Sequence, residues 1–103
     1  MGKLFYDSGF SADFEDRALI HLQVVIGGKL RRGEPFYFSW HDGQTVGGGR
    51  TTLWLAPQIA LRFKYFGSRW PAINPVWISV LTASSNSTHG LQLLPEPPPD
   101  SGS

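Results

Sequence analysis

Residues 16–33 read DRALIHLQVVIGGKLRRG, and the apolar side chains of this stretch recur at helical spacing. Four of them fall on one face of a 3.6-residue helix: Leu19, Leu22, Ile26 and Leu30. Asp16 occupies the position of an N-terminal cap, and basic side chains precede Gly33, as is typical of a helix C-terminus. The stretch therefore predicts a helix whose apolar stripe needs a sheet to cover it.

Two glycines interrupt this pattern. Gly27 and Gly28 each cost about 1 kcal/mol relative to alanine inside a helix, so a compensating reason is needed. Close packing of the helix on a sheet would supply one. The alternative is a helix that stops near Ile26 and is followed by a turn. The end signals favour the continuous helix.

The segment before the helix predicts a β-hairpin. Lys3–Asp7 and Phe10–Glu15 both alternate between apolar and polar residues, and Ser8-Gly9 between them is typical of a turn.

Three aromatic-rich strands are predicted after the helix, in a meander. They cover Pro35–Trp40, Thr51–Ala56 and Ile59–Phe66. The glycine-rich stretch His41–Gly49 connects the first two, and a turn at Gly67–Pro71 follows the third.

Asn74 followed by Pro75 predicts the start of a second helix, because an asparagine side chain can accept hydrogen bonds from the first-turn amides. This helix should end in the stretch Ser84–Thr88, with a last short strand at Gly90–Leu94. We predict a single domain over residues 1–95 and a disordered proline-rich tail over 96–103.

These elements predict an α+β fold, in which an antiparallel sheet with the chain order ββαβββαβ carries two helices packed on one face. The residues expected to face the helices are Phe36, Phe38, Leu53, Leu55, Leu61, Phe63, Leu91 and Leu93. The residues expected to face outward are Tyr37, Ser39, Thr52, Trp54, Arg62, Lys64 and Gln92.

Composition excludes several classes of function. The 103 residues include no cysteine, which excludes disulfides, thiolate zinc sites and cysteine nucleophiles. No apolar run is long enough to span a membrane and the start lacks an export signal, so we expect a cytoplasmic protein without a membrane partner. The net charge is +1, and residues 1–95 carry nine bases and six acids, which is only mildly basic.

The outward residues suggest the first candidate site. Tyr37, Trp54, Arg62 and Lys64 would combine stacking planes and cations on one surface, as single-stranded nucleic-acid platforms do. Further residues could extend this surface: Lys29, Arg31, Arg32, Arg69 and Trp70. The alternative is ordinary sheet surface or a dimer patch, with helix-end cations that serve the macrodipole.

No catalytic motif is complete. The glycine-rich segment Gly47–Thr52 enters a predicted strand, whereas a P-loop enters a helix and contains a lysine. His41 with Asp42 lacks a nucleophile placed by any motif. His21 lies off the apolar stripe and should be solvated, and neither it nor His89 stands at metal-ligand spacing.

The acidic cluster Asp13, Glu15 and Asp16 shows no cleft for paired-carboxylate catalysis, and Asp16 is better explained as a helix cap. We therefore predict no catalytic residue, no cofactor and no metal.

The segments 16–27 and 29–34 nevertheless resemble a family of short actinobacterial proteins. The resemblance continues through Phe38-Ser39-Trp40, Gly49–Leu55 and two shorter segments, 67–69 and 90–92, and covers nearly all of the predicted domain. Many members carry the label of ATP-dependent DNA ligase, which implies a lysine nucleophile in the pattern Lys-x-Asp-Gly.

That pattern is absent from this chain. Lys3, Lys29 and Lys64 do not begin it, and in the nearest match, residues 40–43, Trp40 stands in place of the lysine. The resemblance is therefore compatible with an accessory domain of DNA metabolism and not with a self-contained ligase.

Two hypotheses follow. The first is a non-enzymatic interaction domain that forms homodimers through its aromatic sheet face. The alternative is a nucleic-acid-binding accessory module whose partner is a single strand or a protein of DNA metabolism. An enzyme comes third, because it would need a pocket that gathers His41, Asp42 and Arg50.

Overall fold

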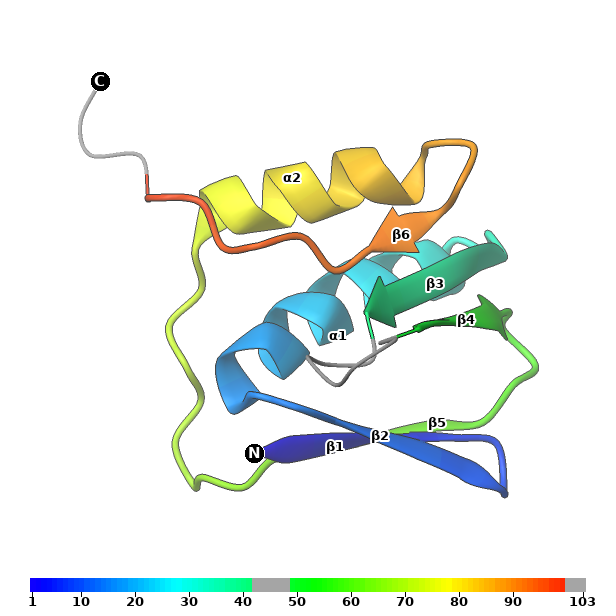
Figure 1. Ribbon diagram of the computed structural model, residues 1–103, viewed down its shortest axis with the longest axis horizontal. Coiled ribbons are helices and arrows are strands. Elements are labelled where there is room, and N and C mark those ends of the chain that lie inside the picture. The colour runs from blue at the N-terminus through cyan, green and yellow to red at the C-terminus, as the bar shows by residue number, and fades with distance from the viewer. Residues whose placement is uncertain (42–48, 100–103) are drawn as a thin grey trace.

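The computed structural model describes residues 1–41 and 49–99 of the chain, and within them it shows an α+β fold (Figure 1). The elements are β1 Gly2–Tyr6, β2 Phe10–Phe14, α1 Asp16–Arg31, β3 Phe36–His41, β4 Arg50–Leu55, β5 Leu61–Lys64, α2 Pro75–Ser85 and β6 Leu91–Gln92. Their order along the chain is the predicted ββαβββαβ.

The strands form two three-stranded sheets, so the prediction of one antiparallel sheet is wrong. Sheet A has the order β2-β1-β5, and sheet B has the order β4-β3-β6 with β6 parallel to β3. After β4 the chain passes through Pro57, which cannot donate to a strand ladder. It then reaches sheet A, where the Asp7 N–H donates to the Ala60 carbonyl (2.8 Å) and β5 pairs with β1 instead of β4.

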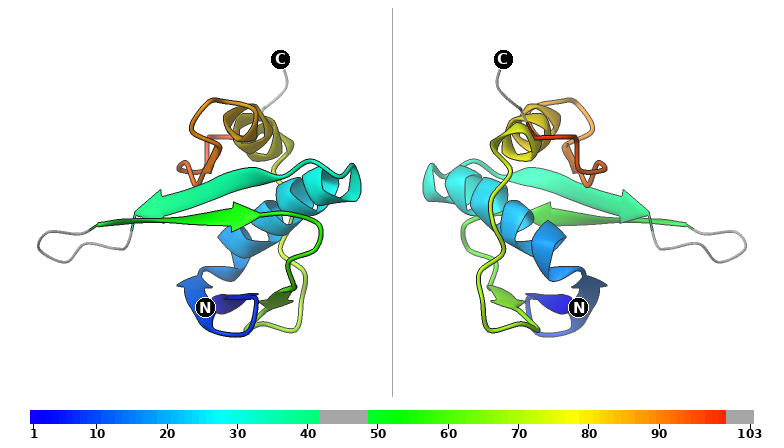
Figure 2. Two further views of the ribbon diagram at one scale, coloured as in Figure 1. Left: turned by 90° about the vertical axis from the view of Figure 1, so that its right-hand side faces the viewer. Right: turned by 90° about the vertical axis from the view of Figure 1, so that its left-hand side faces the viewer.

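Helix α1 runs between the two sheets (Figures 1 and 2). Its buried residues cover more than one stripe: Leu19, Ile20, His21, Leu22, Val25, Ile26 and Lys29. A single apolar cluster joins four of them, Leu19, Leu22, Val25 and Ile26, to two aromatic or aliphatic side chains of each sheet: Leu4 and Phe14 of sheet A, and Phe36 and Phe38 of sheet B. The helix is therefore the shared core of both sheets, and one sheet alone could not cover it.

Helix α2 begins at the predicted cap. The Asn74 Oδ1 accepts hydrogen bonds from the N–H groups of Val76 (3.0 Å) and Trp77 (3.4 Å). The helix packs beside α1 and against β6, with Trp77 and Leu81 buried in the common core. The asparagine therefore satisfies two of the amides that a helix start leaves without partners.

The alternation predicted for the sheet residues is largely confirmed. Every residue expected to face the helices is buried or packs partly buried against the core. Of the residues expected to face outward, Tyr37, Thr52, Trp54, Arg62 and Lys64 are exposed, and Gln92 is partly buried. Ser39 is the exception, because it is only 3% exposed.

Helix α1 continues through its two glycines to Arg31, as the end signals predicted. The proposed reason, close packing on a sheet, is wrong for Gly27. A Cβ atom added at Gly27 would meet no described atom within 4 Å, and one added at Gly28 would meet only the Arg32 guanidinium, at 3.7 Å.

Gly90, by contrast, is required by its position. It has a φ of +80°, which side chains disfavour, and an added Cβ atom would clash with the Tyr37 carbonyl oxygen. This close approach brings the chain into the parallel pairing of β6 with β3.

We expect Gly90→Ala to lower the free energy of unfolding by about 2 kcal/mol or more, because strain at positive φ adds to a backbone clash. Gly27→Ala is the matched control. It should raise stability by about 0.5–1 kcal/mol, because alanine favours a helix interior and meets no obstacle there. Urea unfolding followed by circular dichroism measures both. Equal stability of the two variants would contradict the role assigned to Gly90.

Candidate interaction surfaces

The four residues predicted to share one outward surface lie on two different sheets. Tyr37 and Trp54 are register partners in sheet B, whereas Arg62 and Lys64 belong to β5 of sheet A. They do not share a sheet face, because β5 pairs with β1. The prediction was wrong because it assumed that β5 continues the meander beside β4. The aromatic pair and the basic pair therefore belong to two separate surfaces.

The outward face of sheet B is centred on an aromatic pair. The rings of Tyr37 and Trp54 lie edge to face, with centroids 5.0 Å apart. Tyr37 is 50% and Trp54 44% exposed. Further along the same face, the Arg50 guanidinium lies 3.5 Å from the His41 Nε2. Helices α1 and α2 pack on the opposite face of the sheet, so neither of the described helices covers this one (Figure 2).

The open edge of β4 is partly occupied. The Leu93 N–H donates to the Ser39 carbonyl (3.2 Å), so the peptide groups of Ser39 point toward β6. Thr52 is the register partner of Ser39, so its peptide groups point the other way, toward the open edge of β4. Peptide direction alternates along a strand, and therefore the peptide groups of Trp54 point toward the same edge. There the Tyr6 hydroxyl donates to the Trp54 carbonyl at 2.6 Å. Tyr6 thus takes one end of this edge and leaves the aromatic face free.

The outward face of sheet A is basic. Lys3 and Lys64 are register partners, so their side chains lie side by side on one face. Asp13 pairs with Lys3 at 2.6 Å. In the next row the Arg62 guanidinium lies 4.0 Å above the Phe5 ring centroid. Across these two rows three cations face one carboxylate.

The loop after β5 displays two aromatic side chains on a fixed backbone. Phe66 is 83% and Trp70 is 70% exposed. The Asp16 carboxylate accepts hydrogen bonds from the N–H groups of Phe66 (3.0 Å) and Gly67 (2.7 Å), which lower the pKa of Asp16. Asp16 was predicted as the helix cap, but the N-cap residue is Glu15. Asp16 instead ties α1 to this loop.

Two further contacts hold the same loop to α1. The Tyr65 hydroxyl donates to Gln23 at 2.5 Å, and burial together with the Asp16 charge raises the pKa of Tyr65 to about 12. At the far end of the loop, the Arg17 guanidinium donates to the Ala72 carbonyl at 2.8 Å. The loop is therefore anchored at both ends while its aromatic side chains stay in solvent.

Of the residues predicted to extend the surface, Lys29 is buried. It is 6% exposed, its ammonium donates to the Asn86 side chain (2.7 Å) and pairs with Glu34 (3.3 Å), and it lies 5.5 Å from the Phe36 ring centroid. The prediction treated it as a helix-end cation in solvent, whereas the end of α2 packs over it. Lys29 therefore joins the two helices and is not part of an open surface.

The other predicted extensions are exposed but lie apart. Arg31 and Arg32 stand at the C-terminal end of α1, where Arg32 pairs with Glu34 at 3.2 Å. That pairing, with a smaller contribution from Lys29, lowers the pKa of Glu34. Arg69 and Trp70 stand in the loop after β5, close to Lys64 in the chain. Arg69 and Trp70 thus follow the strand that carries Arg62 and Lys64, whereas the helix-end cations belong to α1 and the residue after it.

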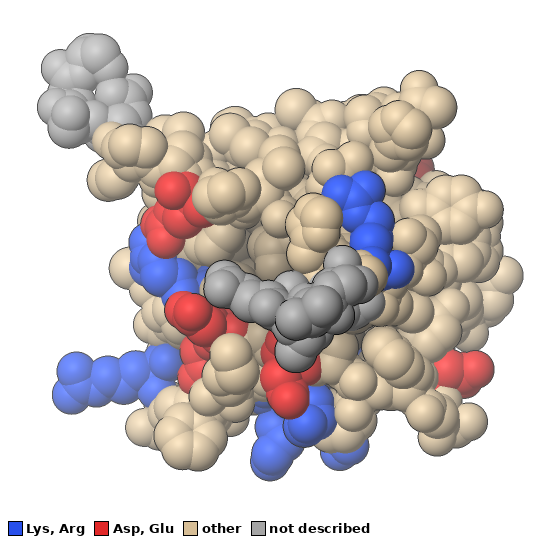
Figure 3. Space-filling model, in the orientation of Figure 1, with Lys and Arg blue, Asp and Glu red and all other residues tan. Residues whose placement is uncertain are grey.

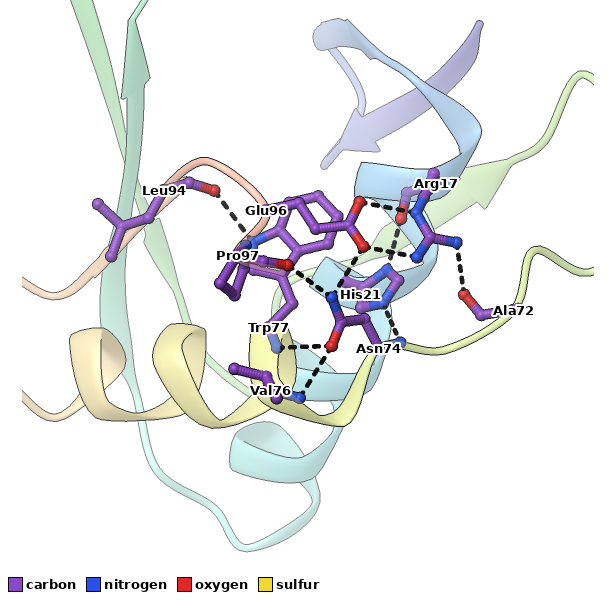
Figure 4. Close-up of polar contacts among 9 residues, drawn as sticks. All are labelled: Arg17, His21, Ala72, Asn74, Val76, Trp77, Leu94, Glu96 and Pro97. Carbon is purple, nitrogen blue, oxygen red and sulfur yellow. Dashed lines mark hydrogen bonds and ion pairs between the residues drawn. The ribbon is translucent and has the colours of Figure 1, made fainter. Parts of the chain in front are cut away.

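His21 is fully buried, although it was expected to be solvated. The Asn74 N–H donates to its Nε2 at 2.8 Å (Figure 4). A backbone N–H can only donate, so Nε2 carries no proton and Nδ1 donates to the Arg17 carbonyl at 2.7 Å. The ring centroid lies 4.5 Å from that of Trp77. No local pattern marks this position, because its burial depends on α2 packing beside α1.

Glu96 ties the C-terminal segment to both helices (Figure 4). Its carboxylate accepts two hydrogen bonds from Arg17, at 2.7 and 2.5 Å, and one from the Asn74 amide at 2.9 Å. These contacts lower the pKa of Glu96 to about 2. The Asn74 amide also donates to the Pro97 carbonyl. We expected a disordered tail from residue 96, but the packed chain reaches Pro97, and only the rest of the tail stays a prediction.

Two chemical interpretations fall partly outside the described residues, namely Asp42 beside His41 and the stretch 47–48 of the glycine-rich loop. Within residues 1–41 and 49–99, no cluster of three or more His, Asp or Glu side chains could hold a metal ion. In the same residues, neither helix has the length and apolar character needed to cross a bilayer.

Residues 1–96 match a family model described as a domain of unknown function, DUF7882. The chain belongs to this family. The match spans both sheets, both helices and Glu96, so both surfaces are part of the DUF7882 domain. No curated protein and no solved structure matches the chain. The family description names no activity, and the ligase label and the actinobacterial origin stay predictions from the resemblance.

We expect acid to weaken the folded state through Glu96. The pKa of Glu96 is about 2 in the folded protein against an ordinary value of 4.5, so the unfolded chain binds the proton first. The stabilisation is complete above about pH 5 and is lost as the pH falls toward about 2. Urea unfolding of the wild type and Glu96→Gln across this range should show a difference that shrinks on acidification. A difference that is constant with pH would contradict this role.

Proposed function

We propose that this DUF7882 domain is a non-enzymatic interaction domain that self-associates through the outward face of sheet B. The observation that carries the proposal is the exposed Tyr37–Trp54 pair on a sheet face that neither α1 nor α2 covers. Tyrosine and tryptophan supply large, rigid contact areas and are enriched at protein interfaces.

A second copy is the partner that this face fits. In a twofold dimer each patch meets itself, so a self-associating patch must not repel its own copy. The centre of the sheet B face is aromatic and uncharged, and Arg50 stands at one end beside His41. The sheet A face, with three cations and one carboxylate, would repel a second copy of itself.

Contact through the face is favoured over contact through the strand edge. Adding a strand to β4 would need the peptide groups of Thr52 and Trp54 to pair with a partner strand. The Tyr6 hydroxyl already occupies the Trp54 carbonyl at that edge. The proposed dimer therefore packs two aromatic faces together without extending the sheet.

Sedimentation velocity or light scattering over a range of protein concentrations tests the proposal. We expect the wild type to dimerise, and Trp54→Ala to raise the dimer Kd about 30-fold, which corresponds to about 2 kcal/mol for a central aromatic residue. Trp70→Ala is the matched control, because Trp70 is also an exposed tryptophan but lies in the loop after β5.

Two results would contradict self-association through this face. One is a wild type that stays monomeric up to about 100 μM, because the dimer Kd would then be higher than that of a functional dimer. The other is a dimer whose Kd is the same in the wild type and in Trp54→Ala.

A further inference from the structure

We infer that the outward face of sheet A, together with the loop after β5, binds single-stranded nucleic acid. This surface consists of Lys3, Arg62, Lys64, Phe66, Arg69 and Trp70. None of these residues belongs to sheet B, so the inference does not depend on the proposed dimer.

The arrangement of charge on sheet A calls for an anion. Like charges directly opposite each other on a sheet destabilise it, and Lys3 and Lys64 are such a pair. Asp13 balances Lys3 alone, and among the described residues Lys64 has no ion pair. Arg62 adds a third cation one row away. A chain of phosphates across this face would offset the positive charge that Asp13 alone leaves in excess.

The aromatic residues lie directly after these cations in the chain. Trp70 tilts 60° from the Tyr65 ring, so it is not covered by parallel stacking, and Phe66 is almost fully in solvent. The loop donates hydrogen bonds to Asp16 and Gln23 and accepts one from Arg17, so little loop entropy remains to be lost on binding. Each base stacked on such a ring contributes about 1–3 kcal/mol.

A single strand fits this surface better than an anionic bilayer does. The cations lie in rows on a sheet face, and the contact with Phe5 holds the Arg62 guanidinium close to that face. Figure 3 shows Lys and Arg side chains along the lower edge of the molecule, where Figure 1 places sheet A. A row of phosphates with bases to one side uses both the cations and the rings.

The test is fluorescence anisotropy with labelled single-stranded DNA and RNA of about 20 nucleotides, enough to cover one site. Protein is added to about 100 μM at about 50 and 200 mM salt. We expect binding that weakens with salt. Arg62→Gln with Lys64→Gln should weaken it at least tenfold and reduce the salt slope by about 0.7 for each phosphate that the variant no longer neutralises.

Three controls separate binding from folding and from the dimer. Arg31→Gln with Arg32→Gln removes the same two positive charges, but at the end of α1. It should weaken binding only by the long-range effect of the lower net charge, and so by less than Arg62→Gln with Lys64→Gln. Lys64→Gln removes a repulsion with Lys3, so its unfolding midpoint should not fall. Trp70→Ala should weaken binding with the salt slope unchanged, whereas Trp54→Ala should leave binding of the monomer intact.

Several outcomes would overturn the inference. The first is no change in anisotropy with any oligonucleotide. The second is an equal loss of affinity in the sheet A and helix-end double variants, and the third is wild-type affinity in Trp70→Ala. If the protein cosediments with phosphatidylserine vesicles and does not bind the oligonucleotides, the surface is a membrane-binding site instead. Because Trp54→Ala tests only the dimer, failure of one proposal leaves the other standing.

Discussion

Helix α1 must be buried on more than one side, and the rest of the fold follows from that requirement. Its buried positions span far more than the stripe through Leu19, Leu22 and Ile26. In Figure 1 sheet A lies below α1, α2 packs on it from above, and β3 and β4 of sheet B lie to its right. Burying a large apolar side chain stabilises the fold by about 1.5–3 kcal/mol, so leaving either side open would cost several such contributions.

The polar residues at the start of α1 fix the segments that are neither helix nor strand. Asp16 holds two amides of the loop after β5, Arg17 reaches the Ala72 carbonyl and Glu96, and His21 accepts from Asn74. Each of these contacts joins segments far apart in the chain. The first turn and a half of the helix therefore determines where α2 begins, where the C-terminal segment lies and how the aromatic loop is displayed.

Local signals in the sequence were sufficient for the elements and insufficient for their partners. The Asn74-Pro75 helix start and the strand alternation depend on neighbours in the chain, and both were predicted correctly. Which strand pairs with β5 depends on distant residues, and the single-sheet prediction failed there. The same limit explains why the burial of His21 and Lys29 was not predicted. Contacts with α2 and its C-terminal end bury both residues, and the spacing within residues 16–33 gives no sign of a second helix.

Splitting the strands into two sheets also separates two kinds of outward surface. A patch that meets its own copy must carry little charge, and a patch that attracts a polyanion must carry an excess of cations. Had Tyr37, Trp54, Arg62 and Lys64 shared one face, these requirements would conflict. With the aromatic pair on sheet B and the cations on sheet A, they do not. A dimer formed through sheet B would keep the basic faces of both copies open. A single-stranded nucleic acid long enough to reach both faces would then bind more tightly, through avidity, than it binds to either face alone.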